Sequence, residues 1–160
     1  MPSINTWGPT VWTFFHALAE NVREEKFAEI KITLFGMIKN ICSFLPCPDC
    51  SLHAKHFLSR VNIDKISNKH DFQSLIYMFH NMVNKKNNKP MYSFSQLQKY
   101  RNINVLHAFN QFVKVYNTNG NMNMLTDTFH RGMVVKNTAS VLKKNVSAFH
   151  YPNTAIPQTN

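Results

Sequence analysis

The chain has 160 residues, of which 44% are hydrophobic, and this length is enough for one domain with a packed core. Only 4 residues are glycine, and neither a strand-like alternation of Val, Ile and Thr nor a glycine-rich phosphate loop occurs, which argues against an all-β or dinucleotide-binding α/β chain. The formal net charge of +10 allows an anionic partner, but the lysines are scattered and no arginine-rich arm occurs. Charge alone therefore favours a solvated basic surface over a nucleic-acid groove, and the composition predicts an all-α protein.

The sequence contains no feature typical of a secreted or membrane protein. Residues 1–5 have no basic region followed by an apolar run, so we expect no secretory signal. No apolar stretch is long enough to span a bilayer. The 3 cysteines are too few for a disulfide-stapled secreted scaffold, and two of them form one Cys-x-x-Cys pair. That pair indicates redox or metal chemistry within a folded domain.

Five helices are predicted from apolar residues that recur at steps of three and four. The second has the clearest stripe, from Phe27 to Phe44, and Pro46 ends it. Pro48 suits the first position of the third helix, because a proline there loses no hydrogen bond. In chain order the expected segments are 7–22, 27–44, 47–59, 71–87 and 103–116, with a short element at 95–100. The buried face of the last segment is expected to comprise Ile103, Leu106, Phe109, Val113 and Tyr116.

The composition changes after residue 116. Residues 117–121 are rich in asparagine and include a glycine, as in a linker, and the last ten residues are polar with two prolines. Between them, residues 125–149 have the pattern of one weak helix. We therefore predict a functional domain at 1–116 and a C-terminal extension at 117–160, partly disordered or weakly helical.

Cys47 and Cys50 are the first candidates for chemistry. At a helix start both sulfur atoms lie near unpaired backbone N–H groups and the positive end of the helix dipole, which favours the thiolate and lowers the thiol pKa. A spacing of three positions also lets the two residues close a small, reducible disulfide. These properties suit thiol–disulfide exchange.

The alternative for this pair is a zinc site that uses His53 and His56. On one helix, steps of three residues drift by about 60° each, so Cys47 and His56 point to nearly opposite sides. A four-ligand site from this helix alone therefore fails. A zinc site shared with His16 or His80 stays open as the less favoured alternative.

Two further clusters could bind a ligand. Trp12 and His16 are four apart on one helix face, where an aromatic ring and an imidazole could clasp a planar cofactor, although each alone is more often a core residue. His80 and Asn84 share a face of the fourth helix, and polar groups there are costly unless they meet a polar ligand. Nearby lysines could bind phosphates or belong to a solvated face. These are Lys85, Lys86 and Lys89.

Together these clusters resemble the Erv/ALR family of FAD-linked sulfhydryl oxidases. The order is Trp-Gly-x-x-x-Trp-x-x-Phe-His from Trp7, Cys-x-x-Cys-x-x-His from Cys47, and His-Asn-x-x-Asn-x-x-x-x-Lys-Pro from His80. The similarity spans residues 7 to 94 and is closest to the compact members from large cytoplasmic DNA viruses, of the African swine fever virus type. It implies a four-helix bundle plus a short fifth helix, with FAD bound at the mouth of the bundle.

The resemblance also implies roles for individual residues. Cys50 would be the flavin-facing thiol and Cys47 the outer thiol that exchanges with substrate. The positions implied to bind FAD are Gly8, Trp12, His16, Asp49, His53, His80, Asn81, Val83, Asn84, Lys85 and Phe94. Phe94 stands where relatives often have a tryptophan, and the arginine that many carry ahead of the first-helix tryptophan is absent. No second, shuttle cysteine pair occurs. Cys42 is expected to be a buried apolar residue, with a resolving or intermolecular cysteine as the minor alternative.

By this resemblance the protein is an enzyme that forms disulfides in protein substrates and passes electrons through FAD to molecular oxygen, giving hydrogen peroxide. Because it lacks a shuttle pair, we expect it to act directly on a thioredoxin-like or other Cys-x-x-Cys protein. The family also implies a homodimer through the first two helices, here non-covalent, in the host cytoplasm at virus assembly sites and in the virion. The rival hypothesis is a non-enzymatic, basic helical module that binds zinc, nucleic acid or another protein.

Overall fold

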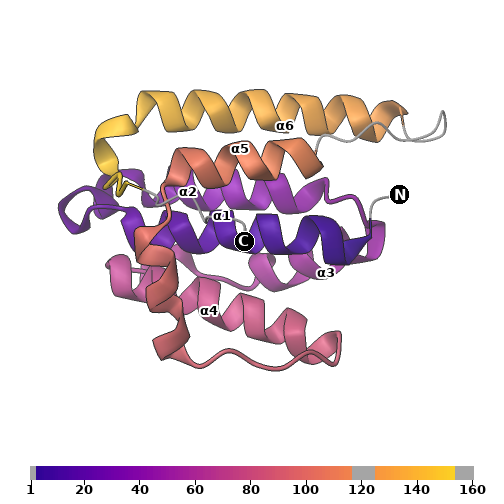
Figure 1. Ribbon diagram of the computed structural model, residues 1–160, viewed down its shortest axis with the longest axis horizontal. Coiled ribbons are helices and arrows are strands. Elements are labelled where there is room, and N and C mark those ends of the chain that lie inside the picture. The colour runs from indigo at the N-terminus through magenta and orange to yellow at the C-terminus, as the bar shows by residue number, and fades with distance from the viewer. Residues whose placement is uncertain (1–2, 117–124, 154–160) are drawn as a thin grey trace, which may run out of the picture.

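Helices account for all the regular elements of the computed structural model, which describes residues 3–116 and 125–153 (Figure 1). The elements are α1 Ile4–Asn21, α2 Glu24–Ser43, α3 Pro48–Ser59, η1 Ile63–Lys65, α4 Lys69–Lys86, η2 Phe94–Asn102, α5 Val105–Tyr116, α6 Leu125–Lys144 and η4 Val146–Ala148, where η marks a 3₁₀ helix. The all-α fold predicted from composition and periodicity is confirmed.

Local sequence signals explain where the helices begin. The Ser3 side chain accepts a hydrogen bond from the Asn5 N–H at the start of α1, and the Asn68 side chain accepts one from Asp71 N–H at the start of α4. Cys47 occupies the N-cap position of α3, and Pro48 is the first helical residue, as predicted. Asn88 follows α4 with a positive φ of 53°, so the chain turns away directly after the helix.

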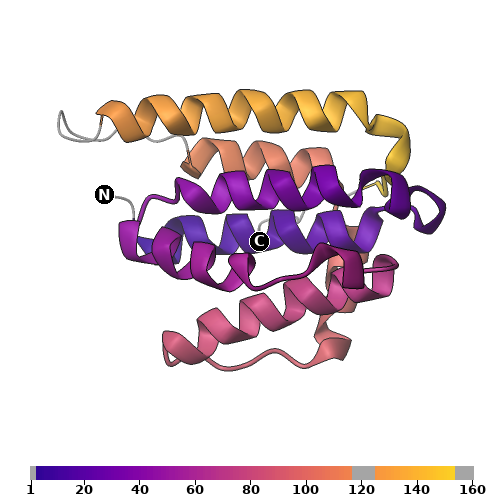
Figure 2. The ribbon, with the colours of Figure 1, turned by 180° about the vertical axis from the view of Figure 1, so that it is seen from behind.

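Helix α1 is the central element of the bundle. It packs against α5 and α4 and contacts η2, whereas α2 packs against α3 and α6. Two opposite views show α6 along one edge of the molecule and α4 along the other, with α1 and α2 between them (Figures 1 and 2). The core therefore lies around α1 and α2. Its fully buried side chains include Phe14, Phe15, Leu18, Ile38 and Ile41.

The predicted stripe of α2 is buried through Ile41, but the predicted face of the fifth helix is wrong in part. Leu106 is 41% exposed, and Ile103 precedes the helix. The residues that α5 buries are instead Val105, Ala108, Phe109, Phe112 and Tyr116. Apolar residues surround most of this helix, so two overlapping stripes fit its sequence. The observed one buries the large ring of Phe112, which stacks on Phe14 at 5.6 Å.

The helix predicted within 125–149 is present as α6, which packs against α2 and buries Val134 and Leu142. Beyond α6 the chain returns to the α1–α2 junction, where Val22 and Phe149 form an isolated antiparallel bridge. The linker predicted at 117–121 lies outside the described residues, and the domain boundary there stays a prediction. Among the described residues, no helix is long and apolar enough to cross a membrane.

Candidate active site

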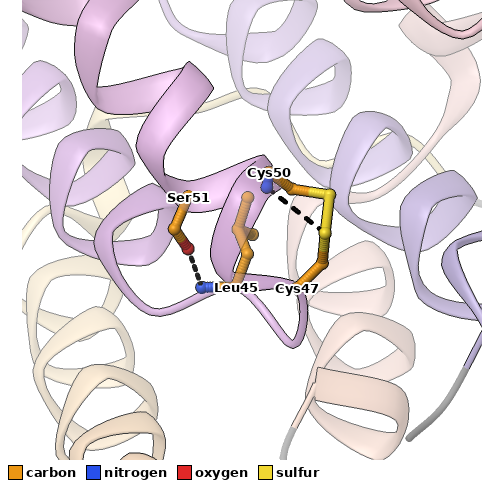
Figure 3. Close-up of a disulfide and its surroundings, with 4 residues drawn as sticks. All are labelled: Leu45, Cys47, Cys50 and Ser51. Carbon is orange, nitrogen blue, oxygen red and sulfur yellow. Dashed lines mark hydrogen bonds between the residues drawn. A yellow bond between two sulfur atoms is a disulfide. The ribbon is translucent and has the colours of Figure 1, made fainter.

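Cys47 and Cys50 form a disulfide at the N-terminus of α3 (Figure 3). Their Cα atoms are 5.2 Å apart, within the range that a disulfide spans. The Cys50 backbone N–H donates to Cys47 Sγ at 3.2 Å, and the Leu45 N–H donates to Ser51 Oγ at 2.8 Å. The second bond fixes the loop before the pair. Both cysteines are half-buried, so the disulfide is held firmly yet reachable from solvent.

The disulfide opens onto a cavity of about 960 Å³, at the upper end of the usual range for small-molecule sites. Residues from α1, α3, α4 and η2 line it, together with the segment before η2. Nine of the residues predicted to act or to bind a cofactor line the cavity. They are Gly8, Trp12, Cys47, Asp49, Cys50, His53, His80, Val83 and Asn84.

The rings of Trp12, Phe79 and His80 form one wall of this cavity. Trp12 of α1 stacks on His80 of α4 with ring centroids 4.2 Å apart and planes only 8° from parallel. Phe79 and Trp12 meet edge to face, with ring centroids 5.0 Å apart. Both rings of this parallel pair line the cavity, and rings held flat in this way suit a planar ligand.

Two buried histidines lie behind this surface. His16 Nε2 and His80 Nδ1 are 2.8 Å apart and share a hydrogen bond, and the Tyr100 ring stacks on His16 at 4.5 Å. Burial, together with the nearby charges of His80 and Lys99, lowers the pKa of His16 to about 3. Burial, Lys99 and Lys89 lower the pKa of His80 to about 4. Both rings are therefore neutral at physiological pH, and one donates a proton that the other accepts.

Three lysines line the same cavity and give it a basic rim: Lys86, Lys89 and Lys99. Lys89 Nζ donates to Asn5 Oδ1 at 3.3 Å, which ties it to the start of α1. Lys99 Nζ donates to the Tyr92 hydroxyl at 3.2 Å and lies over the Tyr92 and Tyr100 rings. Positive charge at the mouth of an apolar cavity suits a ligand with a flat ring and an anionic part.

Four predicted binding residues do not line the cavity. His16 lies behind His80, and Lys85 is exposed on α4. The Asn81 side chain holds Tyr92 instead: Asn81 Nδ2 donates to Tyr92 O at 3.0 Å, and Tyr92 N–H donates to Asn81 Oδ1 at 2.8 Å. Phe94 is 40% exposed and packs against His70 and Tyr77. The cofactor-binding role of these four residues stays a prediction.

In the segment from Tyr92 to Ile103, the sequence predicted a cofactor contact for Phe94 but not for the residues that line the cavity. Tyr92, Gln96, Lys99 and Tyr100 all line the cavity, as does Ile103. A 3₁₀ helix has no amphipathic stripe with period 3.6, so hydrophobic periodicity does not indicate which face of this segment points inward. The two tyrosines and a lysine shortly after Lys89-Pro90 were the available signal.

Cys42 lies at the inner side of the cavity and is buried. Burial raises the pKa of its thiol well above the ordinary value, so the group stays protonated. This fits its interpretation as a buried apolar residue. No cluster of three or more His, Cys, Asp or Glu residues placed to hold a metal ion occurs in the described part of the chain.

A family model matches this chain, and three of its relatives carry the name FAD-linked sulfhydryl oxidase. The sequence model of the Erv1/Alr family matches residues 9–102. The FAD-linked sulfhydryl oxidase of a Kenyan isolate of African swine fever virus is 35% identical over 97 residues, which cover 61% of this chain and 78% of that protein. That of a Namibian isolate is 34% identical over the same shares. The mitochondrial FAD-linked sulfhydryl oxidase erv1 of Schizosaccharomyces pombe is 23% identical over 94 residues, 58% of this chain and 52% of that protein. No solved structure matches significantly.

Proposed function

This chain belongs to the Erv1/Alr family, and on that premise we propose that it is an FAD-linked sulfhydryl oxidase with Cys47 and Cys50 as its catalytic pair. The observation that carries the proposal is the disulfide itself, which lines a large, apolar, ring-walled cavity. A structural disulfide has no need of such a cavity. A redox-active one needs an electron acceptor beside it.

The residues around the cavity fit FAD. The parallel Trp12 and His80 rings suit the flat flavin, and Val83 and Asn84 extend this wall along α4. The rim lysines suit the two phosphates, and one of them, Lys99, lies over the ring of Tyr92. The neutral His16–His80 pair keeps this wall free of charge, which favours an apolar ring system. His53 and Asp49 lie on the disulfide side.

The first half of the reaction is exchange at the disulfide. A substrate thiolate attacks Cys47 Sγ, the Cys47–Cys50 bond breaks, and Cys50 leaves as a thiolate. The second substrate thiol then attacks the substrate sulfur of the mixed disulfide, so Cys47 leaves with its electron pair. The Cys50 N–H, which points at Cys47 Sγ in the disulfide, stabilises that leaving thiolate. The substrate has lost two electrons and two protons, and the pair has gained them.

The second half restores the disulfide. When bound, FAD would supply a two-electron acceptor for the reduced pair, with molecular oxygen as the final oxidant and hydrogen peroxide as its product. Cys50 stands in the first turn of α3, where the helix dipole favours its thiolate. Cys50 and His53 are three apart on one face of α3 and both line the cavity, which makes the His53 imidazole our candidate acceptor for the proton of Cys50. Burial, with smaller effects of Lys86 and His56, lowers the pKa of His53, which keeps it available as an acceptor.

We also propose the partners and the setting. Because Cys47 is half-exposed, a thioredoxin-like or other Cys-x-x-Cys protein could reach it directly. The similarity to virus proteins supports action in the host cytoplasm at virus assembly sites, and in the virion. A non-covalent homodimer is proposed through α1 and α2. The part of α2 around the 68% exposed Ile32 is open to such a contact.

A spectrum of the purified protein tests this function. We expect a yellow protein that releases FAD on denaturation and consumes oxygen when given dithiothreitol. Hydrogen peroxide should accumulate in proportion to the oxygen consumed. A colourless protein that carries one zinc per chain would contradict the proposal and favour the non-enzymatic alternative.

A further inference from the structure

The C-terminal part of the chain reaches the cavity wall through a continuous set of hydrogen bonds. We call residues 148–152 the C-terminal clasp. They lie beyond the region that matches the family, which ends at residue 102. The clasp has no role in the proposed function. Its contacts lead to residues that hold the cavity wall in place.

The clasp binds the junction between α1 and α2. Arg23 N–H donates to Ala148 O at 2.8 Å, and His150 N–H donates to Asn21 O at 2.7 Å. The ring of Phe149, 1% exposed, is buried in the core beside this bridge. Asn21 is the last residue of α1, so its carbonyl has no partner within the helix. The clasp supplies one and fixes the end of the helix.

The side chain of Asn21 connects the end of α1 to the backbone of η2. Asn21 is 3% exposed, and its Nδ2 lies within hydrogen-bond distance of three carbonyl oxygens: Ile103 O at 2.9 Å, Ala17 O of its own helix at 3.0 Å and Tyr100 O at 3.3 Å. The Tyr100 and Ile103 carbonyls belong to the end of η2 and the residue that follows it. A second link runs from Asn104 Nδ2 to Pro152 O at 3.4 Å. The clasp is thus tied to the end of η2 and the residues directly after it by two links, one through Asn21 and one at Asn104.

The series of contacts that starts at the clasp ends at the cavity wall. The Tyr100 ring stacks on His16, His16 shares a hydrogen bond with His80, and His80 stacks on Trp12. Each step is a direct contact, and the three outer residues Tyr100, His80 and Trp12 line the cavity. The Arg101–Glu20 ion pair at 3.1 Å also ties η2 to α1, so loss of the clasp should loosen this wall rather than abolish it.

We propose that the C-terminal clasp is a positioning element of the cofactor site: by holding Asn21 it fixes the η2 backbone at Tyr100 and so tightens the wall that binds FAD. The inference rests on the proposed function. Phe149, His150 and Asn21 touch neither the disulfide nor the cavity and act only through Tyr100 and Ile103, which do line it. They are positioning residues.

A single backbone change tests the clasp. His150→Pro removes the N–H that donates to Asn21 O, and Phe149, with φ −122° and ψ 152°, already has a conformation that precedes proline well. His150→Ala is the matched control, because it keeps the N–H and loses only an exposed side chain. Asn21→Ala removes the next link and serves if the proline variant does not fold.

Each full-length variant is titrated with FAD after its flavin has been removed, and its thermal unfolding is recorded. We expect His150→Pro and Asn21→Ala to raise the FAD dissociation constant about 3- to 10-fold, as expected for one weakened buried hydrogen bond. His150→Ala should stay within about twofold of the unchanged protein. If the first two variants melt at lower temperature but bind FAD with the original dissociation constant, the clasp only stabilises the fold and the proposal is wrong.

A second readout does not depend on FAD binding. In a Trp7→Phe background Trp12 is the only tryptophan, and its emission reports the stacking on His80. Without flavin, His150→Pro should shift this emission and His150→Ala should not. Identical emission from both variants would overturn the clasp proposal. Failure of the unchanged protein to bind FAD would instead overturn the proposed function.

Discussion

The two sides of the cavity differ in exposure, and the difference matches their tasks. On the α3 side the disulfide is half-buried, and the two residues between its cysteines, Pro48 and Asp49, are exposed. On the opposite side, His16 is 2% exposed and His80 is 7% exposed, and both are kept neutral by burial and neighbouring positive charge. One side is open to reaction with a partner protein, and the other excludes water.

This contrast explains how one cavity can hold both a reactive disulfide and a tightly bound cofactor. Thiol–disulfide exchange needs an accessible sulfur and a stabilised thiolate, which a helix N-terminus at the surface supplies. Binding of a flat cofactor needs an apolar wall whose polar groups already have partners. If the contrast is right, changes on the α3 side should remove turnover and leave FAD bound. Changes on the histidine side should weaken FAD binding and leave thiol–disulfide exchange at the Cys47–Cys50 pair intact.

The largest effect is expected at the disulfide. Cys47→Ser and Cys50→Ser should each lower dithiothreitol oxidation by roughly 10³-fold or more, because each removes a sulfur that must react. Both variants should stay yellow, which the ratio of flavin to protein absorbance measures. Cys42→Ala, which leaves the catalytic pair intact, is the control. Normal turnover in either serine variant would rule out the exchange mechanism.

A large effect on cofactor binding is expected at His80. His80→Ala removes the stacking partner of Trp12 and leaves the buried His16 nitrogen without its hydrogen bond. Together these losses should weaken FAD binding by about 100-fold, measured by titration of the flavin-free protein. His56→Ala, on the exposed face of α3, should bind FAD normally. An unchanged affinity in His80→Ala would mean that this wall does not hold the flavin.

The same pair predicts a pH dependence of stability. The pKa values of His16 and His80 are about 3 and about 4 in the folded state and about 6.5 in the unfolded chain. Below pH 6.5 the unfolded state therefore binds more protons, and the free energy of unfolding falls as the pH falls. The loss should reach ~1.4 kcal/mol per histidine for each pH unit.

Denaturant titrations between pH 7 and pH 4 measure that slope. His16→Asn with His80→Asn should flatten it, even if the double variant is less stable at pH 7. A slope that persists unchanged in the double variant would place the responsible groups elsewhere.

Much of the α3 side follows from the sequence because its signals are local. Cys47 before Pro48 marks a helix start, and the structure begins α3 there. The regular stripe of α2 fixes which of its faces is buried. Such signals concern residues a few positions apart, and backbone geometry alone connects them.

The histidine side is less predictable because it joins distant segments. His16 and His80 are 64 positions apart, and no periodicity states that their nitrogens meet. Tyr92 and Tyr100 come from η2 and the segment before it, where a three-residue turn has no helical stripe to read. The inner face of α5 was misassigned for a related reason, since only packing against Phe14 selects between two apolar stripes.

The smallest expected effect concerns Lys99, which both helps to keep the two histidines neutral and places a positive charge at the cavity rim. Its charge lowers the pKa of both His16 and His80, and its Nζ lies over the Tyr92 and Tyr100 rings at the cavity rim. Lys99→Met keeps the length of the side chain and removes the charge. Because an exposed charge contributes little, FAD affinity should fall only about 3-fold at low salt, and less at high salt because ions screen the attraction. Lys114→Met, on the exposed face of α5, is the control for net charge. Equal losses in both variants would mean that overall charge, rather than the position of Lys99 at the rim, attracts the cofactor.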